Sequence, residues 1–105
     1  MNRGEIRWYK FQPPDKKRPV LILTRNSILD VLGEVTIAPI TTTIRNIPSE
    51  VYLSKLDGMP RDSVVNFDHI QTVSKSKIGS LITSLSPKKL GLVSKAISFA
   101  LELND

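Results

Sequence analysis

Residues 18–24 read Arg-Pro-Val-Leu-Ile-Leu-Thr and carry the strongest structural signal in the chain. From Val20 to Thr24 the stretch is almost wholly apolar, rich in β-branched and leucine side chains, and shows no alternation with polar residues. Such a run is typical of a strand that is buried on both faces. We therefore predict a central strand here. Because it follows a polar loop directly, Arg18 is expected at the entrance of this strand.

The segments around this strand predict antiparallel partners for it. Glu5–Phe11 alternates with period two, which predicts a strand whose two faces are both partly covered. Gln12–Lys17 holds two prolines and three charges, which exclude a strand and predict an exposed connection. A wide loop or one helical turn is expected over Thr24–Gly33. Further strands are expected over Glu34–Ile40, Ser49–Ser54, Ser63–Val73 and Ile78–Thr83, with a turn at Asp57-Gly58.

The last segment predicts a packing helix. Ser86 is a suitable N-cap, and Pro87 stands at the first helical position, where its missing N–H costs nothing. Apolar residues then recur at helical spacing at Leu90, Val93, Ile97, Ala100 and Leu101. Five or so short antiparallel strands around one core, followed by this helix, predict a small barrel-like α+β fold.

Length and composition limit the classes of protein to consider. A chain of 105 residues leaves room for one domain, which we take to span residues 1–105. Hydrophobic residues at 40% and charged residues at 24% exclude a disordered chain. The absence of cysteine excludes disulfides and thiol nucleophiles and favours a cytoplasmic location. The longest apolar run, Val20–Leu23, is too short for a membrane span, and no export signal is expected.

The positive charge is concentrated near the start of the sequence. The net charge is +5, and residues 1–25 hold seven basic and two acidic residues, whereas residues 26–105 hold eight of each. This excess is consistent with solubility alone. It also fits a local positive field that attracts phosphate groups.

Several kinds of chemistry find no support in the sequence. His69 is the single histidine, and no carboxylate pair has a spacing that calls for a metal ion. A Gly-x-Ser-x-Gly motif is absent, and Asp68 and His69 would point to opposite faces of a strand. No glycine-rich phosphate-binding loop occurs either. We therefore expect neither a metal nor a cofactor.

Four short motifs follow one another along the chain: Arg3-Gly4-Glu5-Ile6, Arg18-Pro19-Val20-Leu21-Ile22, Ala38-Pro39-Ile40-Thr41 and Arg61-Asp62-Ser63-Val64. In this order they resemble the successive signatures of the MazF/PemK (Kid) toxins, and the resemblance continues to the terminal helix. It implies an SH3-like antiparallel β-barrel that forms a homodimer. It also implies a sequence-specific, metal-independent endoribonuclease that cuts single-stranded mRNA and is held inactive by a cognate antitoxin.

The resemblance also implies site residues. In some relatives the catalytic pair is the arginine of the Arg-Pro-Val motif and the threonine of the Pro-Ile-Thr motif, which here are Arg18 and Thr41. Kid-type relatives use an arginine and an aspartate two residues apart; Asn66 and Asp68 stand at those places, so that arginine is missing. The Gln-x-Arg-Thr motif of the family departs here to His-Ile-Gln-Thr over residues 69–72. The residues expected to bind RNA are Lys16, Lys17, Thr42, Asn66, Asp68, His69 and Gln71.

Physical chemistry supports the same catalytic pair. When the 2′-hydroxyl of RNA attacks its own phosphate, the enzyme must fix an in-line geometry and stabilise charge on the phosphorane. The guanidinium of Arg18 offers a planar fork of donors that matches two phosphate oxygens. Thr41 would donate to the same phosphate, and the general base stays open.

Other interpretations of these residues remain. A toxin of the same fold could bind a protein target, as the gyrase-poisoning CcdB group does. A non-catalytic RNA- or peptide-binding module is a further class, although 6% aromatic residues leave too few for a polyproline groove. Asp68 and His69 either read bases or occupy a wet strand face. Three aromatic residues are expected in the core, and the Arg61-Asp62 pair in a salt-bridged turn; the aromatic residues are Trp8, Phe11 and Phe67.

Overall fold

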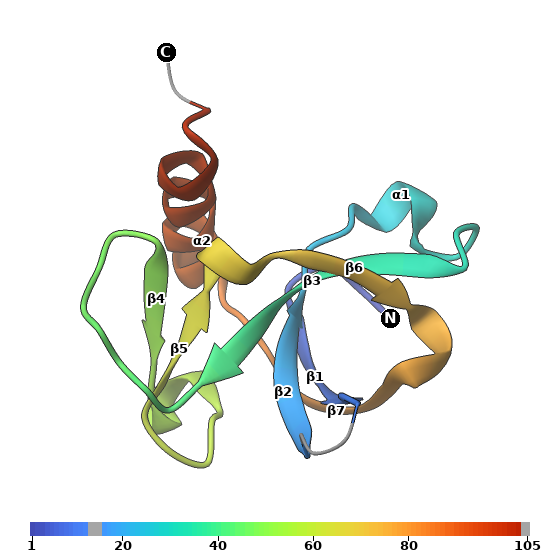
Figure 1. The fold of residues 1–105 in the computed structure, drawn as a ribbon, viewed down its shortest axis with the longest axis horizontal. Coiled ribbons are helices and arrows are strands. Elements are labelled where there is room, and N and C mark those ends of the chain that lie inside the picture. Colours follow the sequence, from blue (N-terminus) through green and yellow to red (C-terminus); the bar gives the residue numbers. More distant parts are fainter. Residues whose placement is uncertain (13–15, 104–105) are drawn as a thin grey trace.

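The computed structural model describes residues 1–12 and 16–103. Figure 1 shows these residues as antiparallel strands with a long helix at the C-terminal end. The strands are β1 (Glu5–Lys10), β2 (Lys17–Ile22), β3 (Glu34–Thr41), β4 (Glu50–Leu53), β5 (Ser63–Asn66), β6 (Gln71–Ser74) and β7 (Ile78–Ser84). The helices are α1 (Asn26–Leu29) and α2 (Pro87–Leu101). Within the described residues, no helix is long and apolar enough to cross a membrane.

The strands form one sheet of antiparallel pairs, in the order β4-β5-β3-β2-β1-β7, with β6 also paired to β3. The predicted antiparallel α+β architecture with a C-terminal helix is therefore confirmed. The ladder does not close into a full barrel, because β4 and β7 remain as edges of the sheet.

Strand β2 is the centre of the sheet, as the apolar run predicted. It pairs with β1 on one side and with β3 on the other. Leu21 belongs to a core cluster with Ile6 and Phe67, whereas Val20 and Ile22 belong to a second cluster on the opposite face. The run is buried on both faces for this reason. The strand begins at Lys17 and ends at Ile22, so Arg18 lies inside the strand rather than before it.

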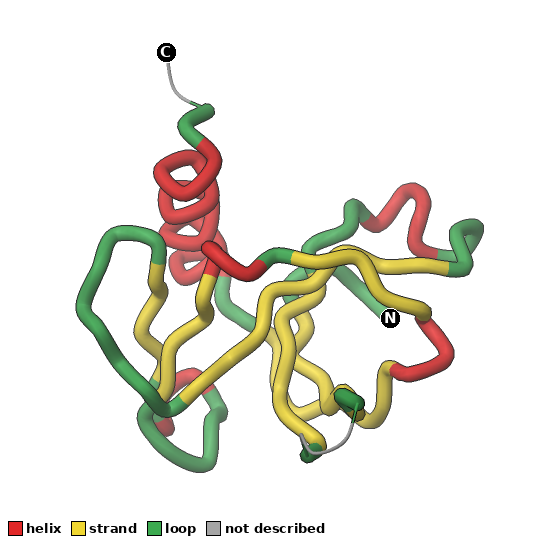
Figure 2. The backbone as a smooth tube through the Cα atoms, viewed as in Figure 1, coloured by secondary structure: helices red, strands yellow, loops and turns green. Residues whose placement is uncertain are grey.

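The long strand expected over Ser63–Val73 is wrong. The chain forms β5, then a 3₁₀ turn (Phe67–His69), then β6, and Figure 2 shows this turn as a helical segment between two strands. Gln71 lies six positions after Val65, but their partners on β3, Ile37 and Ile40, are only three positions apart. The 3₁₀ turn accommodates the extra residues. Asp68 and His69 therefore do not alternate across a strand.

Helix α2 begins as predicted and packs with a slightly different face. The Ser86 side chain accepts a hydrogen bond from the Lys89 amide at 3.2 Å, and Pro87 occupies the first turn. Val93 and Ala96 are the buried residues of this helix. Leu101 was expected on the packing face but is 53% exposed, because it lies in the last turn, beyond the part of the helix that packs on the core.

Candidate active site

A pocket of about 310 Å³ opens where β3 leaves β2 and begins to pair with β5. Its polar side chains are of two kinds, cations and hydroxyls. They are Lys17, Arg18, Arg61, Thr41, Thr42 and Ser63. None of the described residues that line the pocket is acidic. The pocket is therefore chemically suited to a phosphate group.

The strand register explains why Arg18 and Thr41 meet. Val20 of β2 is paired with Pro39 of β3 in an antiparallel ladder. This ladder ends there, because β3 pairs with β5 from Ile40 onward, so Arg18 and Thr41, each two residues beyond the last pair, stand on the two sides of the opening between the strands. Both residues line the pocket, as the catalytic pair of the sequence analysis requires.

The Thr41 hydroxyl is oriented by the backbone just beyond β3. Its oxygen accepts a hydrogen bond from the amide of Thr43 at 3.1 Å. Because this bond uses a lone pair of the oxygen, the hydroxyl proton stays available for donation. Thr41 is half-buried, whereas Thr42 and Arg18 are exposed. The pair thus places a guanidinium and a hydroxyl donor at the same pocket.

Trp8 was expected in the core but lies on the wall of this pocket. It is half-buried, and the Lys17 ammonium lies 5.4 Å from the centre of its ring. The sheet has an open side here, which leaves part of the ring uncovered. Phe67 is buried as expected, at 1% exposed. Phe11 is half-buried and meets the ring of Tyr9 edge to face.

The other predicted RNA-binding residues do not line the pocket. Asn66 is buried, and its side-chain oxygen accepts a hydrogen bond from the Asp68 amide at 2.9 Å, so it caps the 3₁₀ turn. Asp68 accepts a hydrogen bond from the Ser49 hydroxyl at 2.6 Å. His69, the last residue of that turn, and Gln71, the first residue of β6, are both exposed. Lys16 is exposed immediately before β2, and residues 13–15 of its loop lie outside the described residues.

Two pocket residues, Arg61 and Ser63, were missed as site residues. A salt bridge between Arg61 and Asp62 was one interpretation of this motif, but the described residues hold no such ion pair. Instead, Asp62 lies at the phenol of Tyr52, and a hydrogen bond to Asp62 raises the pKa of that tyrosine. The loop that carries Arg61 begins near Gly58, which has a φ of 93°. A side chain at this position would also clash with Thr83, so the turn requires glycine.

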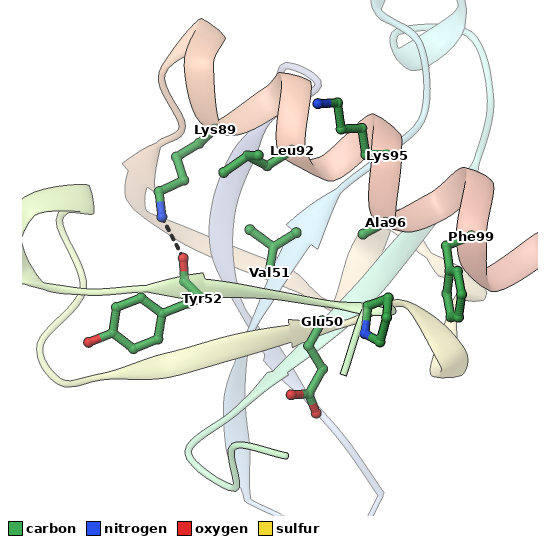
Figure 3. A pocket seen from close by; sticks show the side chains of 9 residues that line it. Glu50, Val51, Tyr52, Lys89, Leu92, Lys95, Ala96 and Phe99 are labelled. Atoms are coloured by element: carbon green, nitrogen blue, oxygen red, sulfur yellow. Dashed lines mark hydrogen bonds between the residues drawn. The ribbon is translucent and has the colours of Figure 1, made fainter. Parts of the chain in front are cut away.

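A second groove lies between β4 and α2, and it contains no predicted site residue (Figure 3). Lys89 crosses it and donates a hydrogen bond to the backbone carbonyl of Tyr52 at 2.6 Å. Its ammonium also lies 3.5 Å from Asp57. Because the carboxylate of Glu50 also lines this groove, it is less suited to an anionic substrate than the pocket of Arg18, whose described lining is not acidic.

The structure is thus a small β-rich domain with a cationic pocket, and comparison with known proteins identifies its family. The family model described as PemK-like, MazF-like toxin of type II toxin-antitoxin system matches residues 2–101, and the chain belongs to this family. It is 41% identical over 91 residues to the probable endoribonuclease MazF2 of Mycobacterium tuberculosis, covering 86% of this chain and 87% of that relative.

Two solved structures have the same fold. The Mycobacterium tuberculosis toxin MazF-mt6 is 37% identical and superposes with a TM-score of 0.88 over 96% of this chain and 99% of its own. A mycobacterial endoribonuclease in complex with its cognate antitoxin is 26% identical, with a TM-score of 0.89 over 100% of this chain and 98% of its own. These similarities favour an RNA-cleaving toxin over a CcdB-like toxin that binds a protein target.

Proposed function

We propose that this chain is the endoribonuclease toxin of a toxin-antitoxin system, that it cleaves single-stranded mRNA, and that Arg18 and Thr41 carry the reaction. The observation that supports the site is their shared place in one cationic pocket without an acidic side chain among its described lining. The names of the relatives, which are endoribonucleases, support the activity.

The reaction is an attack of the substrate on itself. The 2′-oxygen loses its proton and forms a bond to the adjacent phosphorus, and the bond from phosphorus to the 5′-oxygen breaks. The 5′-oxygen takes up a proton, which leaves a 2′,3′-cyclic phosphate and a 5′-hydroxyl. Arg18 stabilises the negative charge that grows on the phosphorane oxygens, and Thr41 donates its hydroxyl proton as a hydrogen bond to the same group.

The general base stays open in this mechanism. A guanidinium has donors and no acceptor, so Arg18 stabilises charge rather than removing the proton. The described lining of the pocket holds neither a carboxylate nor an imidazole. Asp68, which stands at the aspartate position of the Kid-type relatives, lies outside this lining and accepts a hydrogen bond from the Ser49 hydroxyl.

Cleavage of a long RNA tests the activity. The purified protein is incubated with the RNA in the presence of EDTA, and the new ends are sequenced and analysed chemically. We expect one recurrent sequence at the cuts, cyclic phosphate at the 3′ ends and hydroxyl at the 5′ ends. An RNA with 2′-deoxyribose at the scissile nucleotide should bind and stay intact. Cleavage of that substituted RNA would contradict attack by the 2′-hydroxyl.

The same pocket accounts for control by an antitoxin. We expect an acidic, initially flexible antitoxin segment that competes with RNA for the field of Lys17, Arg18 and Arg61 and folds as it binds. We expect RNA cleavage and its inhibition to take place in the cytoplasm, where mRNA is translated. Inhibition of cleavage should follow the loss of RNA binding as antitoxin is added. An antitoxin that stops cleavage while RNA stays fully bound would contradict the competition.

A further inference from the structure

The pocket contains a second arginine and hydroxyl besides Arg18 and Thr41. Arg61 and Ser63 both line it, and Asp62 between them does not. Asp62 instead interacts with Tyr52, whose pKa is raised by a hydrogen bond with this carboxylate. The pocket thus takes one arginine and hydroxyl from β2 and β3, and another from the start of β5.

Arg61 has an uncompensated charge in this position. Its side chain is exposed, and it has no ion pair or hydrogen bond with the rest of the described chain. The neighbouring carboxylate of Asp62 forms no ion pair with Arg61, and its hydrogen bond with Tyr52 raises the pKa of that tyrosine. A complete fork of guanidinium donors is therefore available to an anion in the pocket.

Ser63 adds a second, independent sign that the pocket receives a polar ligand. It is only 2% exposed, and its hydroxyl has no hydrogen-bond partner among the described residues. Buried hydroxyls are almost always paired in folded proteins, and an unpaired one calls for a specific reason. Here Ser63 lines the pocket beside Arg61, with its hydroxyl buried directly behind the wall that a ligand would touch.

The size of the pocket allows more than one phosphate. Its volume of about 310 Å³ is many times the roughly 10–15 Å³ that a cavity needs by the same measure to hold one water molecule. An RNA strand carries a negative charge at every nucleotide, so a strand whose scissile phosphate lies at Arg18 brings further phosphates close by.

We propose that Arg61, with Ser63, binds a second phosphate of the RNA, one of the two that flank the scissile phosphate held by Arg18 and Thr41. This inference rests on the proposed RNA cleavage. Arg61 is a positioning residue in this role. Fixing two consecutive phosphates sets the direction of the strand through the pocket, which brings the attacking 2′-oxygen and the leaving 5′-oxygen into line.

Neutral phosphate analogues test this assignment by binding alone. Once the cleavage site is mapped, RNA oligonucleotides are made with 2′-deoxyribose at the scissile nucleotide and one methylphosphonate linkage, at the scissile phosphate or at either flanking one. Their affinities are measured for the wild type, for Arg61→Ala and for Arg25→Ala. Arg25 is a matched control, since it is also an exposed arginine but lines a different cavity, with Thr36 and Thr72.

The expected result is a coupling between Arg61 and one flanking phosphate. For the wild type, the neutral linkage at that phosphate should weaken binding about tenfold, the usual effect of losing one charge-assisted contact. Arg61→Ala should bind the unmodified RNA about tenfold more weakly than the wild type does. In this variant, the methylphosphonate at the flanking phosphate should cause no further loss of affinity. For Arg61→Ala, the slope of log affinity against log salt concentration should also be shallower by about 0.7, the value for one phosphate contact to a single strand. Arg25→Ala should behave as the wild type in all three respects.

Three outcomes would overturn the proposal. Arg61→Ala could bind every RNA as Arg25→Ala does, which would exclude a contact. Arg61 could instead show coupling to the scissile phosphate, which would mean that Arg18 and Arg61 both contact that phosphate. A wild-type protein that neither binds nor cuts RNA would contradict the proposed function itself, and this last result is distinct from the other two.

Discussion

Ser49 and Ser63 are buried to the same extent, each at 2% exposed, yet only the Ser49 hydroxyl has a hydrogen-bond partner among the described residues. Ser49 donates to Asp68 at 2.6 Å and holds the loop before β4 against the 3₁₀ turn. Ser63 has an unpaired hydroxyl that is buried at the wall of the candidate site. We therefore expect a structural role for Ser49 and a ligand-binding role for Ser63.

Alanine at these two positions should have opposite effects. Ser49→Ala removes a satisfied hydrogen bond and should lower the free energy of unfolding by about 1 kcal/mol or more. Ser63→Ala removes a hydroxyl that gains nothing in the folded state, so its stability should be equal to that of the wild type or up to about 1 kcal/mol higher. Its RNA affinity should nevertheless fall several-fold. Urea denaturation and RNA binding measure both effects. A Ser63→Ala protein that loses stability and keeps its affinity would show that this hydroxyl is structural.

The catalytic pair should respond to substitution without a change in folding. Arg18→Ala and Thr41→Ala should each lose most of the cleavage rate, and Arg18→Ala should lose more because it removes a full charge. Losing one charge-stabilising donor costs about 3 kcal/mol of barrier, near two orders of magnitude in rate. Arg18→Lys should rescue only in part, since an ammonium lacks the planar fork. Single-turnover cleavage and circular dichroism measure rate and folding. An unchanged rate for Arg18→Ala would exclude this site.

The central strand and the terminal helix could be predicted because their signals are local. Val20–Leu23 is apolar at every position, which only a strand covered on both faces tolerates. Ser86 and Pro87 specify the start of a helix by their own chemistry. Arg18 and Thr41 then meet because they stand at the ends of neighbouring strands whose register is set by the core.

The break in the Ser63–Val73 segment could not be predicted from strand propensity. The segment is rich in β-branched residues and has no glycine or proline, so nothing in its pattern ends the strand. The turn forms because Phe67 packs into the core while Asn66 caps the turn through the Asp68 amide. The available signal for the turn was Asn66, because an asparagine side chain readily bonds to the backbone two residues further on and so favours a turn. Trp8 and Arg61 were misjudged for a related reason, because only the three-dimensional arrangement shows which strand faces border a pocket.

Asp68 should behave as a structural residue. Asp68→Asn weakens its bond to the Ser49 hydroxyl, and we expect a loss of about 1 kcal/mol in stability with less than a tenfold change in cleavage rate. In combination with Ser49→Ala, the two losses should not add, because both remove the same contact. Denaturation of the single and double variants tests this. A fall in rate as large as that of Arg18→Ala would instead assign Asp68 a catalytic role of the Kid type.

Glu5 makes the stability of the fold sensitive to acid. Burial raises the pKa of its carboxyl, but hydrogen bonds from Arg7 and from Asn2, with the charge of Arg7, outweigh burial and hold the pKa below its ordinary value of 4.5. The stabilisation is therefore fully present above about 4.5 and is lost as the pH falls through the lower pKa of the folded state. Glu5→Gln should be less stable than the wild type at pH 7 and should lose less on acidification. The exposed Glu34→Gln is the control; if it flattens the acid dependence equally, Glu5 is not its source.

The active species should be a symmetric dimer. One pocket of about 310 Å³ holds only a short part of an RNA strand, and sequence-specific cleavage needs several nucleotides held in order. A two-fold pair joins two such surfaces into a longer channel, and two-fold dimers are the commonest oligomers. We expect sedimentation at micromolar concentration to give twice the chain mass of 11.7 kDa, with cleavage activity lost on dilution below the dimer dissociation constant. A species of 11.7 kDa that still cleaves RNA at its specific sequence would contradict the need for a dimer, and each chain would then have to recognise the RNA alone.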